Sequence, residues 1–148
     1  MSNATPTTHI LTGFPAAASA FVSALENNRL RIARDLGVTP TELRTLFYIG
    51  REVSTTPKAL AGYLGMTTGA VTAISQKLVD AEHLHRVAHP DDRRSLYLEL
   101  TPHGHEVLHR IHEEFNAMLS ASTSHLTPAQ LEAFTEALSS VAIEVRSR

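Results

Sequence analysis

Three histidines, His105, His109 and His112, recur in one predicted helix at spacings of four and three residues. These spacings place the imidazoles on one face of the helix. Two histidines four residues apart can chelate zinc. The first two predicted helices offer no obvious third ligand beyond Glu26 and Glu42. We therefore predict no bound metal and no other cofactor, and keep a zinc-responsive protein as an alternative.

Catalytic chemistry finds little support in the sequence. Serine, histidine and aspartate are present, but there is no Gly-x-Ser-x-Gly nucleophile elbow and no glycine-rich phosphate-binding loop. The chain has no cysteine, which excludes disulfides, thiolate ligands and thiol-based sensing of oxidants. We expect a protein that is not an enzyme.

A different group of residues is suited to reading double-stranded DNA. It lies on one face and at the start of a predicted helix over residues 68–81, and consists of Thr67, Thr68, Gly69, Thr72, Ala73, Gln76 and Lys77. Small residues let a helix lie deep in the major groove, where threonine methyls contact thymine, glutamine binds adenine and lysine reaches guanine or phosphate. The opposite face, with Val71, Ile74, Leu78 and Ala81, should pack inward. A solvent-exposed helix face has a similar composition, so this helix alone leaves both interpretations open.

The segment that follows favours DNA binding. Two alternating segments, residues 84–89 and 96–100, predict a β-hairpin with Asp92, Arg93 and Arg94 at its tip. An arginine at such a tip can enter a narrow minor groove, where the potential is most negative. Asp92 can hold an arginine through a charge-assisted bond. The turn chemistry of Pro-Asp-Asp would also suit a plain solvated turn.

Threonine–proline pairs mark where the helices around these residues begin. Thr39-Pro40 and Thr127-Pro128 are each followed by a residue that can close a capping box, Glu42 and Gln130 respectively. We expect six helices, over about 15–35, 40–50, 57–64, 68–81, 102–122 and 128–146, with a short extended piece at 52–54. The helix pair 57–64 and 68–81, joined by a glycine turn at Gly65, has helix-turn-helix spacing.

The stretches from Leu78 to Leu84 and from Pro90 to Gly104 resemble the signature of the MarR family. That signature runs from the end of the recognition helix through the wing to a Leu-Thr-x-x-Gly helix start, here residues 100–104. The order of six helices and a wing is similar from about Phe14 to Arg148. Two residues depart from it: His89 stands where an acid usually precedes the wing proline, and His83 stands where a lysine or glycine is commoner.

The resemblance implies a transcriptional regulator with a mainly α, winged helix-turn-helix fold that forms a homodimer. It implies recognition helices in successive major grooves of double-stranded DNA, with Asp92 and Arg94 as the acid–arginine pair of the wing. It also implies a small phenolic or other organic effector that relieves DNA binding. Candidate residues for such a pocket, which could equally be plain core, are Phe21, Arg44, Phe47 and Tyr48.

We expect one domain over residues 1–148. The winged helix-turn-helix part covers about 38–100, and the dimerisation helices cover about 14–36 and 101–146. The last helix carries an apolar stripe at Leu131, Phe134, Leu138, Val141 and Val145. A terminal helix has little of its own domain to pack against, so a core shared between two chains is the natural partner.

Composition limits the remaining possibilities. The 148 residues include 13 Lys and Arg against 15 Asp and Glu, a net charge of −2. Because DNA-binding domains are usually basic, an interaction module that has lost DNA binding remains an alternative. No apolar run is long enough to span a membrane. The polar, threonine-rich start of the chain lacks the features of a secretory signal, so we expect a cytoplasmic location.

Overall fold

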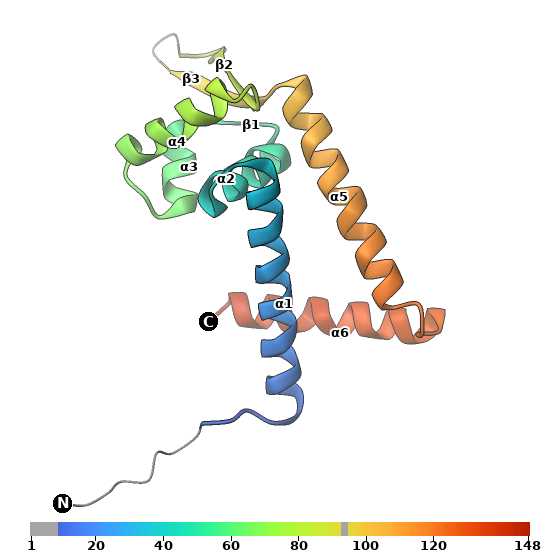
Figure 1. Ribbon diagram of the computed structural model, residues 1–148. Helices are drawn as coiled ribbons and strands as arrows, with labels where there is room; N and C mark the ends of the chain where they lie inside the picture. The colour runs from blue at the N-terminus through green and yellow to red at the C-terminus, as the bar shows by residue number, and fades with distance from the viewer. Residues whose placement is uncertain (1–8, 93–94) are drawn as a thin grey trace, which may run out of the picture. The chain divides into compact units, whose positions relative to one another are not determined.

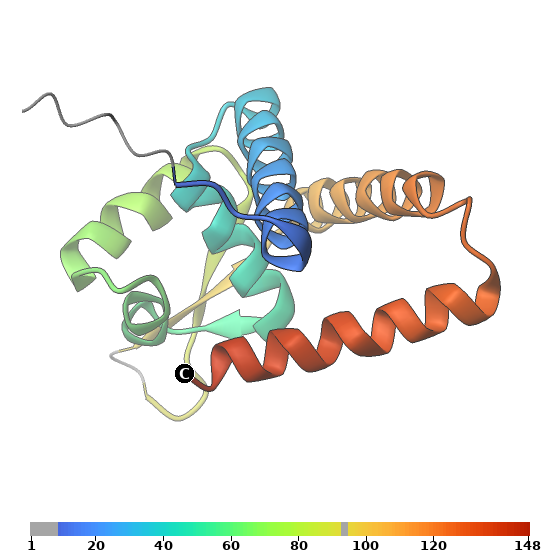
Figure 2. The same cartoon turned by 90° about the horizontal axis from the view of Figure 1, so that it is seen from below.

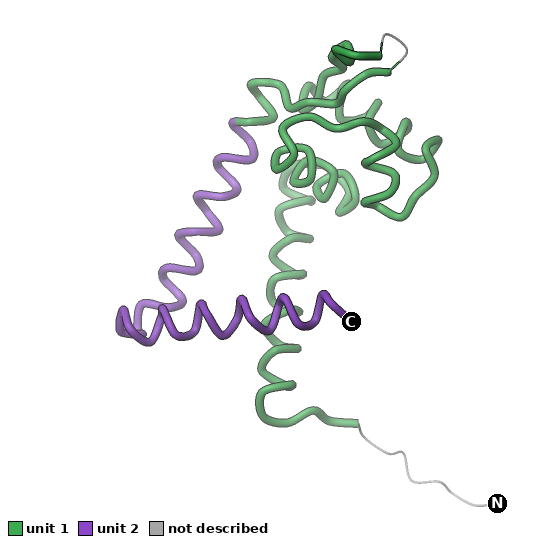
Figure 3. Tube along the Cα trace, turned by 180° about the vertical axis from the view of Figure 1, so that it is seen from behind, with its two compact units in different colours: residues 1–105 green, residues 106–148 purple. Residues whose placement is uncertain are grey.

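The computed structural model describes residues 9–92 and 95–148. Its elements are α1 (Gly13–Leu36), α2 (Pro40–Glu52), β1 (Ser54–Thr55), α3 (Pro57–Leu64), α4 (Thr68–Asp80), β2 (Leu84–Ala88), β3 (Leu96–Leu100), α5 (Pro102–Ser122) and α6 (Pro128–Arg146). The chain gathers into two compact units, residues 1–105 and 106–148 (Figure 3). None of the described helices is both long and apolar enough to cross a membrane.

The predicted helix starts are confirmed at their hydrogen bonds. The hydroxyl of Thr39 accepts from the Glu42 N–H at 3.2 Å, and the Glu42 carboxylate accepts from the Thr39 N–H at 2.8 Å. Thr127 and Gln130 form the same capping box, with bonds of 3.3 and 2.9 Å. Each box satisfies backbone donors that the first turn of a helix leaves unpaired, so these starts are fixed by local sequence.

The end of α2 differs from the prediction. Gly50 does not terminate the helix, which continues to Glu52, and Val53 follows with φ 69°. The extended piece is consequently shifted to Ser54–Thr55, where it becomes β1. The positive φ of Val53 takes the backbone out of the helical conformation, so the helix ends before it.

In the unit of residues 1–105, helices α2, α3 and α4 and the sheet enclose the core. The sheet has the order β1-β3-β2, with antiparallel pairing that places Leu84 opposite Leu100 and Ala88 opposite Leu96. The largest fully buried apolar side chains are Leu43, Leu46, Ile49, Leu60, Val71, Leu78, Leu84 and Leu98. The core therefore anchors α4 and the β2–β3 hairpin, which carry the residues predicted to contact DNA (Figure 1).

The unit of residues 106–148 holds most of α5 and all of α6. Helix α6 has no buried residue. Its predicted apolar stripe is solvent-exposed, from 39% for Leu131 and Val141 to 69% for Val145. The stripe exists as predicted, and none of the residues that the structure describes buries it.

Candidate nucleic-acid interface

Helices α3 and α4 form the predicted helix-turn-helix. Helix α3 ends at Gly65, whose φ of 65° lies in the left-handed region that favours glycine. Thr67 then starts α4, because its hydroxyl accepts from the Ala70 N–H at 3.2 Å. Helix α4 contacts both α3 and β2, so the helix pair and the hairpin lie side by side (Figures 1 and 2).

The inward face of α4 differs in part from the prediction. Val71 and Leu78 are buried as expected and Ile74 is half-buried, but Ala81 is exposed. The helix ends at Asp80, so Ala81 lies outside the helical repeat. Ser75 takes the inward position, and its hydroxyl has no hydrogen-bond partner among the described residues. A serine at a core position gives no hydropathy signal, which is why the sequence pattern missed it.

The opposite face of α4 is exposed throughout, as the prediction required. All seven predicted residues, Thr67, Thr68, Gly69, Thr72, Ala73, Gln76 and Lys77, are solvent-exposed. The Thr72 hydroxyl donates to the Thr68 carbonyl at 2.8 Å, which uses its proton within the helix. Acids are absent from this face until Asp80. The surface is thus small and weakly polar at its N-terminal end, where a groove-binding helix makes its base contacts.

Gln76 is held by two neighbours. Its amide oxygen accepts from Arg86 Nη2 on β2 at 2.9 Å, and its amide nitrogen donates to Asp80 Oδ1 at 2.7 Å. Sequence reasoning found Gln76 but missed Arg86, which is ten residues away along the chain and reaches α4 only because the hairpin folds back beside it.

Lys77 lies at the edge of the exposed face. Its Nζ is 3.7 Å from Glu42 Oε1 on α2, and its side chain remains 71% exposed. Glu42 is buried, and its other oxygen closes the capping box of α2. An exposed ammonium in such a weak ion pair can still turn to a phosphate at small cost.

The turn of the β2–β3 hairpin is organised by His89 and Asp92. His89 Nδ1 accepts from the N–H groups of Asp91 and Asp92, both at 3.1 Å, and its ring stacks on Tyr97 at 4.4 Å. Asp92 accepts from the Ser95 hydroxyl at 2.6 Å. The imidazole thus takes the acceptor role that an acid would have at this position. Arg93 and Arg94 lie outside the described residues, so their pairing with Asp92 stays a prediction.

The four residues predicted to line a ligand pocket lie on two helices, Phe21 on α1 and the other three on α2. Arg44 and Tyr48 meet Tyr63 of α3: the two tyrosine rings stack at 4.1 Å, and the Arg44 guanidinium lies 4.8 Å from the Tyr63 ring centre. Phe47 is half-buried, whereas Phe21 is 39% exposed on α1. Arg44 and Tyr48 therefore contribute to an aromatic and cationic contact between α2 and α3.

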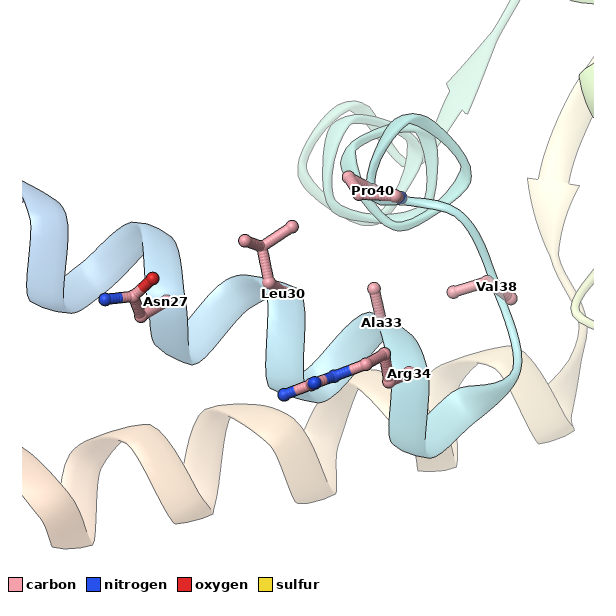
Figure 4. Close-up of a pocket in the computed structure, with 6 residues that line it drawn as sticks. All are labelled: Asn27, Leu30, Ala33, Arg34, Val38 and Pro40. Carbon is pink, nitrogen blue, oxygen red and sulfur yellow. The ribbon is translucent and has the colours of Figure 1, made fainter.

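A concave region of about 510 Å³ is found between α1 and the start of α2. It is lined by Asn27, Leu30, Ala33, Arg34, Val38 and Pro40, as Figure 4 shows. Its wall is mainly apolar and includes one guanidinium. None of the four predicted pocket residues lines it.

The histidines of α5 are exposed. His109 Nε2 is 3.2 Å from Glu113 Oε1, one turn further along the same helix. Among the described residues, no group of three or more histidine, aspartate or glutamate side chains could hold a metal ion.

One histidine is buried. His83, between α4 and β2, is 6% exposed, and its ring stacks with that of His103 at 5.2 Å. Its Nδ1 has no hydrogen-bond partner in the described part of the chain. Burial lowers the pKa of His83 below the usual 6.5, and the nearby His103 lowers this pKa further. Burial therefore favours the neutral form of His83 in the folded structure.

Comparison with known proteins gives one consistent result. The model of the MarR family matches residues 36–95. YkoM of Bacillus subtilis, an HTH-type transcriptional regulator, is 30% identical over 111 residues, which are 75% of this chain and 71% of YkoM. YhjH of the same organism, also an HTH-type regulator, is 32% identical over 79 residues, which are 53% of this chain and 45% of YhjH. These relatives are transcriptional regulators, which confirms the expectation that the chain is not an enzyme.

Solved structures agree with the fold. The transcriptional regulator Tm0710 from Thermotoga maritima superposes with a TM-score of 0.76 at 25% identity, covering 91% of this chain and 97% of that one. NadR in complex with 4-hydroxyphenylacetate superposes with a TM-score of 0.64 at 20% identity, covering 93% of this chain and 98% of that one. The predicted winged helix-turn-helix fold is confirmed.

Proposed function

The chain belongs to the MarR family of transcriptional regulators, and from this premise we propose that it acts as a homodimer on a pseudo-palindromic operator. The exposed face of α4 carries the proposal. It offers small and uncharged side chains at its N-terminal end, while the buried face holds the helix against the core. The proposed DNA contacts are Thr67, Thr68, Gly69, Thr72, Ala73, Gln76 and Lys77 on α4, with Asp92, Arg93 and Arg94 in the wing.

The apolar surface of α6 supports the homodimer. Leu131, Phe134, Leu138, Val141 and Val145 follow one helix face and stay exposed in the single chain. A stripe of this kind is costly to leave in water, and a second copy of the same helix offers a complementary surface. We therefore assign dimerisation to α6, with α1 and α5 as the other proposed dimerisation helices.

Selection from random duplexes tests the DNA-binding part of the proposal. Two-fold symmetry should enrich a pseudo-palindrome whose half-sites are centred about 10 base pairs apart, because the recognition helices enter successive major grooves. Affinity for the selected duplex should fall steeply with salt, since phosphate contacts release counterions. Enrichment of no palindromic sequence would refute the proposal.

A small phenolic or other organic compound is the proposed effector. The NadR complex supports this class, because a structurally similar protein binds 4-hydroxyphenylacetate. The region between α1 and α2 has a mainly apolar wall and the Arg34 guanidinium, a combination that suits an aromatic carboxylate. Calorimetry with aromatic carboxylates should detect binding in the wild type and weaker binding in Arg34→Ala. Arg44 is one of the pocket residues that the sequence predicted, and it does not line this region. Wild-type binding in Arg44→Ala would support the region between α1 and α2, whereas weaker binding in Arg44→Ala alone would favour the pocket that the sequence predicted.

A further inference from the structure

The amide of Gln76 is fixed in one orientation before any DNA is present. Arg86 can only donate, and Asp80 as a carboxylate can only accept. The 2.9 Å bond from Arg86 therefore marks the amide oxygen, and the 2.7 Å bond to Asp80 marks the amide nitrogen. If the amide were turned over, its nitrogen would face Arg86, donor against donor, and its oxygen would face Asp80, acceptor against acceptor. Both neighbours therefore favour the same orientation.

This arrangement leaves the amide able to read a base. A glutamine amide can accept two hydrogen bonds and donate two. Among the described residues, Arg86 uses one acceptor site and Asp80 uses one donor site. One acceptor and one donor remain, which is the number that a bidentate contact with adenine N6 and N7 requires. Arg86 and Asp80 thus orient the amide without occupying it fully.

We propose that Arg86 and Asp80 are positioning residues that set which base pair Gln76 accepts. This inference rests on the proposed function, because it assumes that α4 enters the major groove. Arg86 belongs to β2 and Asp80 to the last turn of α4, so the hairpin and the helix jointly orient one reading group. A long glutamine side chain without such support loses rotamer entropy when it binds a base, which weakens discrimination.

A phosphate contact is the competing role for Arg86, and the two roles have different consequences. Loss of a phosphate contact weakens binding to all sequences alike and makes the salt dependence less steep. Loss of a positioning contact weakens binding mainly to the preferred base pair and leaves the salt dependence unchanged. Discrimination at a single position is therefore the informative measurement.

The experiment measures the affinity of purified variants of the 148-residue chain for the selected operator and for operators substituted at one base pair per half-site. The variants are Arg86→Met, Asp80→Asn, Gln76→Ala and the double variant Arg86→Met with Gln76→Ala. Arg148→Met is the matched control, because it removes one exposed guanidinium that lies beyond α6 and outside the proposed DNA contacts. Circular dichroism verifies the fold of each variant, and Arg86→Lys replaces Arg86→Met if that variant unfolds.

The wild type and Arg148→Met should prefer one base pair at the Gln76 position by about tenfold. Arg86→Met should reduce this preference to about twofold or less. The double variant should lose no more of the preference than Gln76→Ala alone does, because the two residues act as a unit. A preference retained in Arg86→Met, or a uniform loss with a shallower salt dependence, would overturn the positioning role alone. A wild type with no preferred operator would overturn the proposed function as well.

Discussion

The backbone carbonyl of His83 occupies the space that a side chain at Gly104 would need. The same carbonyl accepts from the Thr101 N–H at 3.1 Å, and the Thr101 hydroxyl donates to the carbonyl of Glu82 at 2.5 Å. The first turn of α5 is therefore seated on the turn that follows α4. This contact gives the Leu-Thr-x-x-Gly pattern of the sequence a steric reason: threonine supplies the bonds, and glycine allows the approach.

Gly104→Ala should destabilise the fold. Its methyl group would collide with backbone, which cannot move aside as a flexible side chain could. We expect the free energy of unfolding to fall by roughly 1–3 kcal/mol, measured by urea denaturation. Gly62→Ala in α3 is the matched control, because nothing lies within 4 Å of the added methyl. It should raise the free energy of unfolding by about 0.5–1 kcal/mol through helix propensity. Equal effects of the two substitutions would contradict the account of Gly104.

Val53→Gly should stabilise the protein. Val53 has φ 69° and ψ −54°, a conformation that is unfavourable for a β-branched residue, and its side chain is 72% exposed. Relief of this strain should raise the free energy of unfolding by about 1 kcal/mol. The same substitution at Val22, an exposed position within α1, should lower it instead. A lower melting temperature for Val53→Gly than for the wild type would refute the prediction.

Stability should decrease on acidification because of His83. Its pKa is lowered in the folded state, mainly by burial and further by His103, so the unfolded chain binds a proton more readily. Above the unfolded pKa of about 6.5, His83 is neutral in both states and does not reduce the free energy of unfolding. As the pH falls below about 6.5, the unfolded chain binds a proton that the folded chain binds less readily, so the free energy of unfolding decreases until the lowered folded pKa is reached. His83→Leu should flatten the fall in melting temperature over this range. His125→Leu, at an exposed position, is the control. An unchanged pH profile in His83→Leu would show that another group is responsible.

Arg94→Ala tests the proposed wing contact. Removing the guanidinium should weaken operator binding by about 1–3 kcal/mol and leave the melting temperature unchanged. Arg148→Ala removes an exposed arginine that follows α6, and this variant should bind the operator as the wild type does. Fluorescence anisotropy with a labelled operator measures both variants. An Arg94→Ala variant with wild-type affinity would remove the wing from the proposed interface.

The sequence predicted the elements well, because local signals define them. The capping residues Thr39 and Thr127 and the glycine at 65 act within one helical turn, so the starts of α2 and α6 and the turn between α3 and α4 are confirmed. The end of α2 was missed because a positive φ is uncommon for a β-branched residue, so a valine at position 53 does not indicate a helix end.

The contacts within the interface were less predictable. Arg86 meets Gln76 across ten residues of sequence, and His89 meets two backbone amides only after the hairpin has closed. Ser75 is buried because of its position on α4, although its side chain is polar. Such pairs depend on distances in the folded chain, which neither periodicity nor spacing supplies.

Hydroxyl-radical footprinting of the selected operator tests the central claim most directly, because it shows where on the duplex the protein lies. A dimer that places one α4 in each of two successive major grooves should protect two symmetric blocks of sugars, centred about 10 base pairs apart. Further protection should appear in the flanking minor grooves where the wings would lie, and Arg94→Ala should reduce it. Two symmetric blocks are the result we predict. A single block, or protection that is the same on an unrelated duplex, would contradict it.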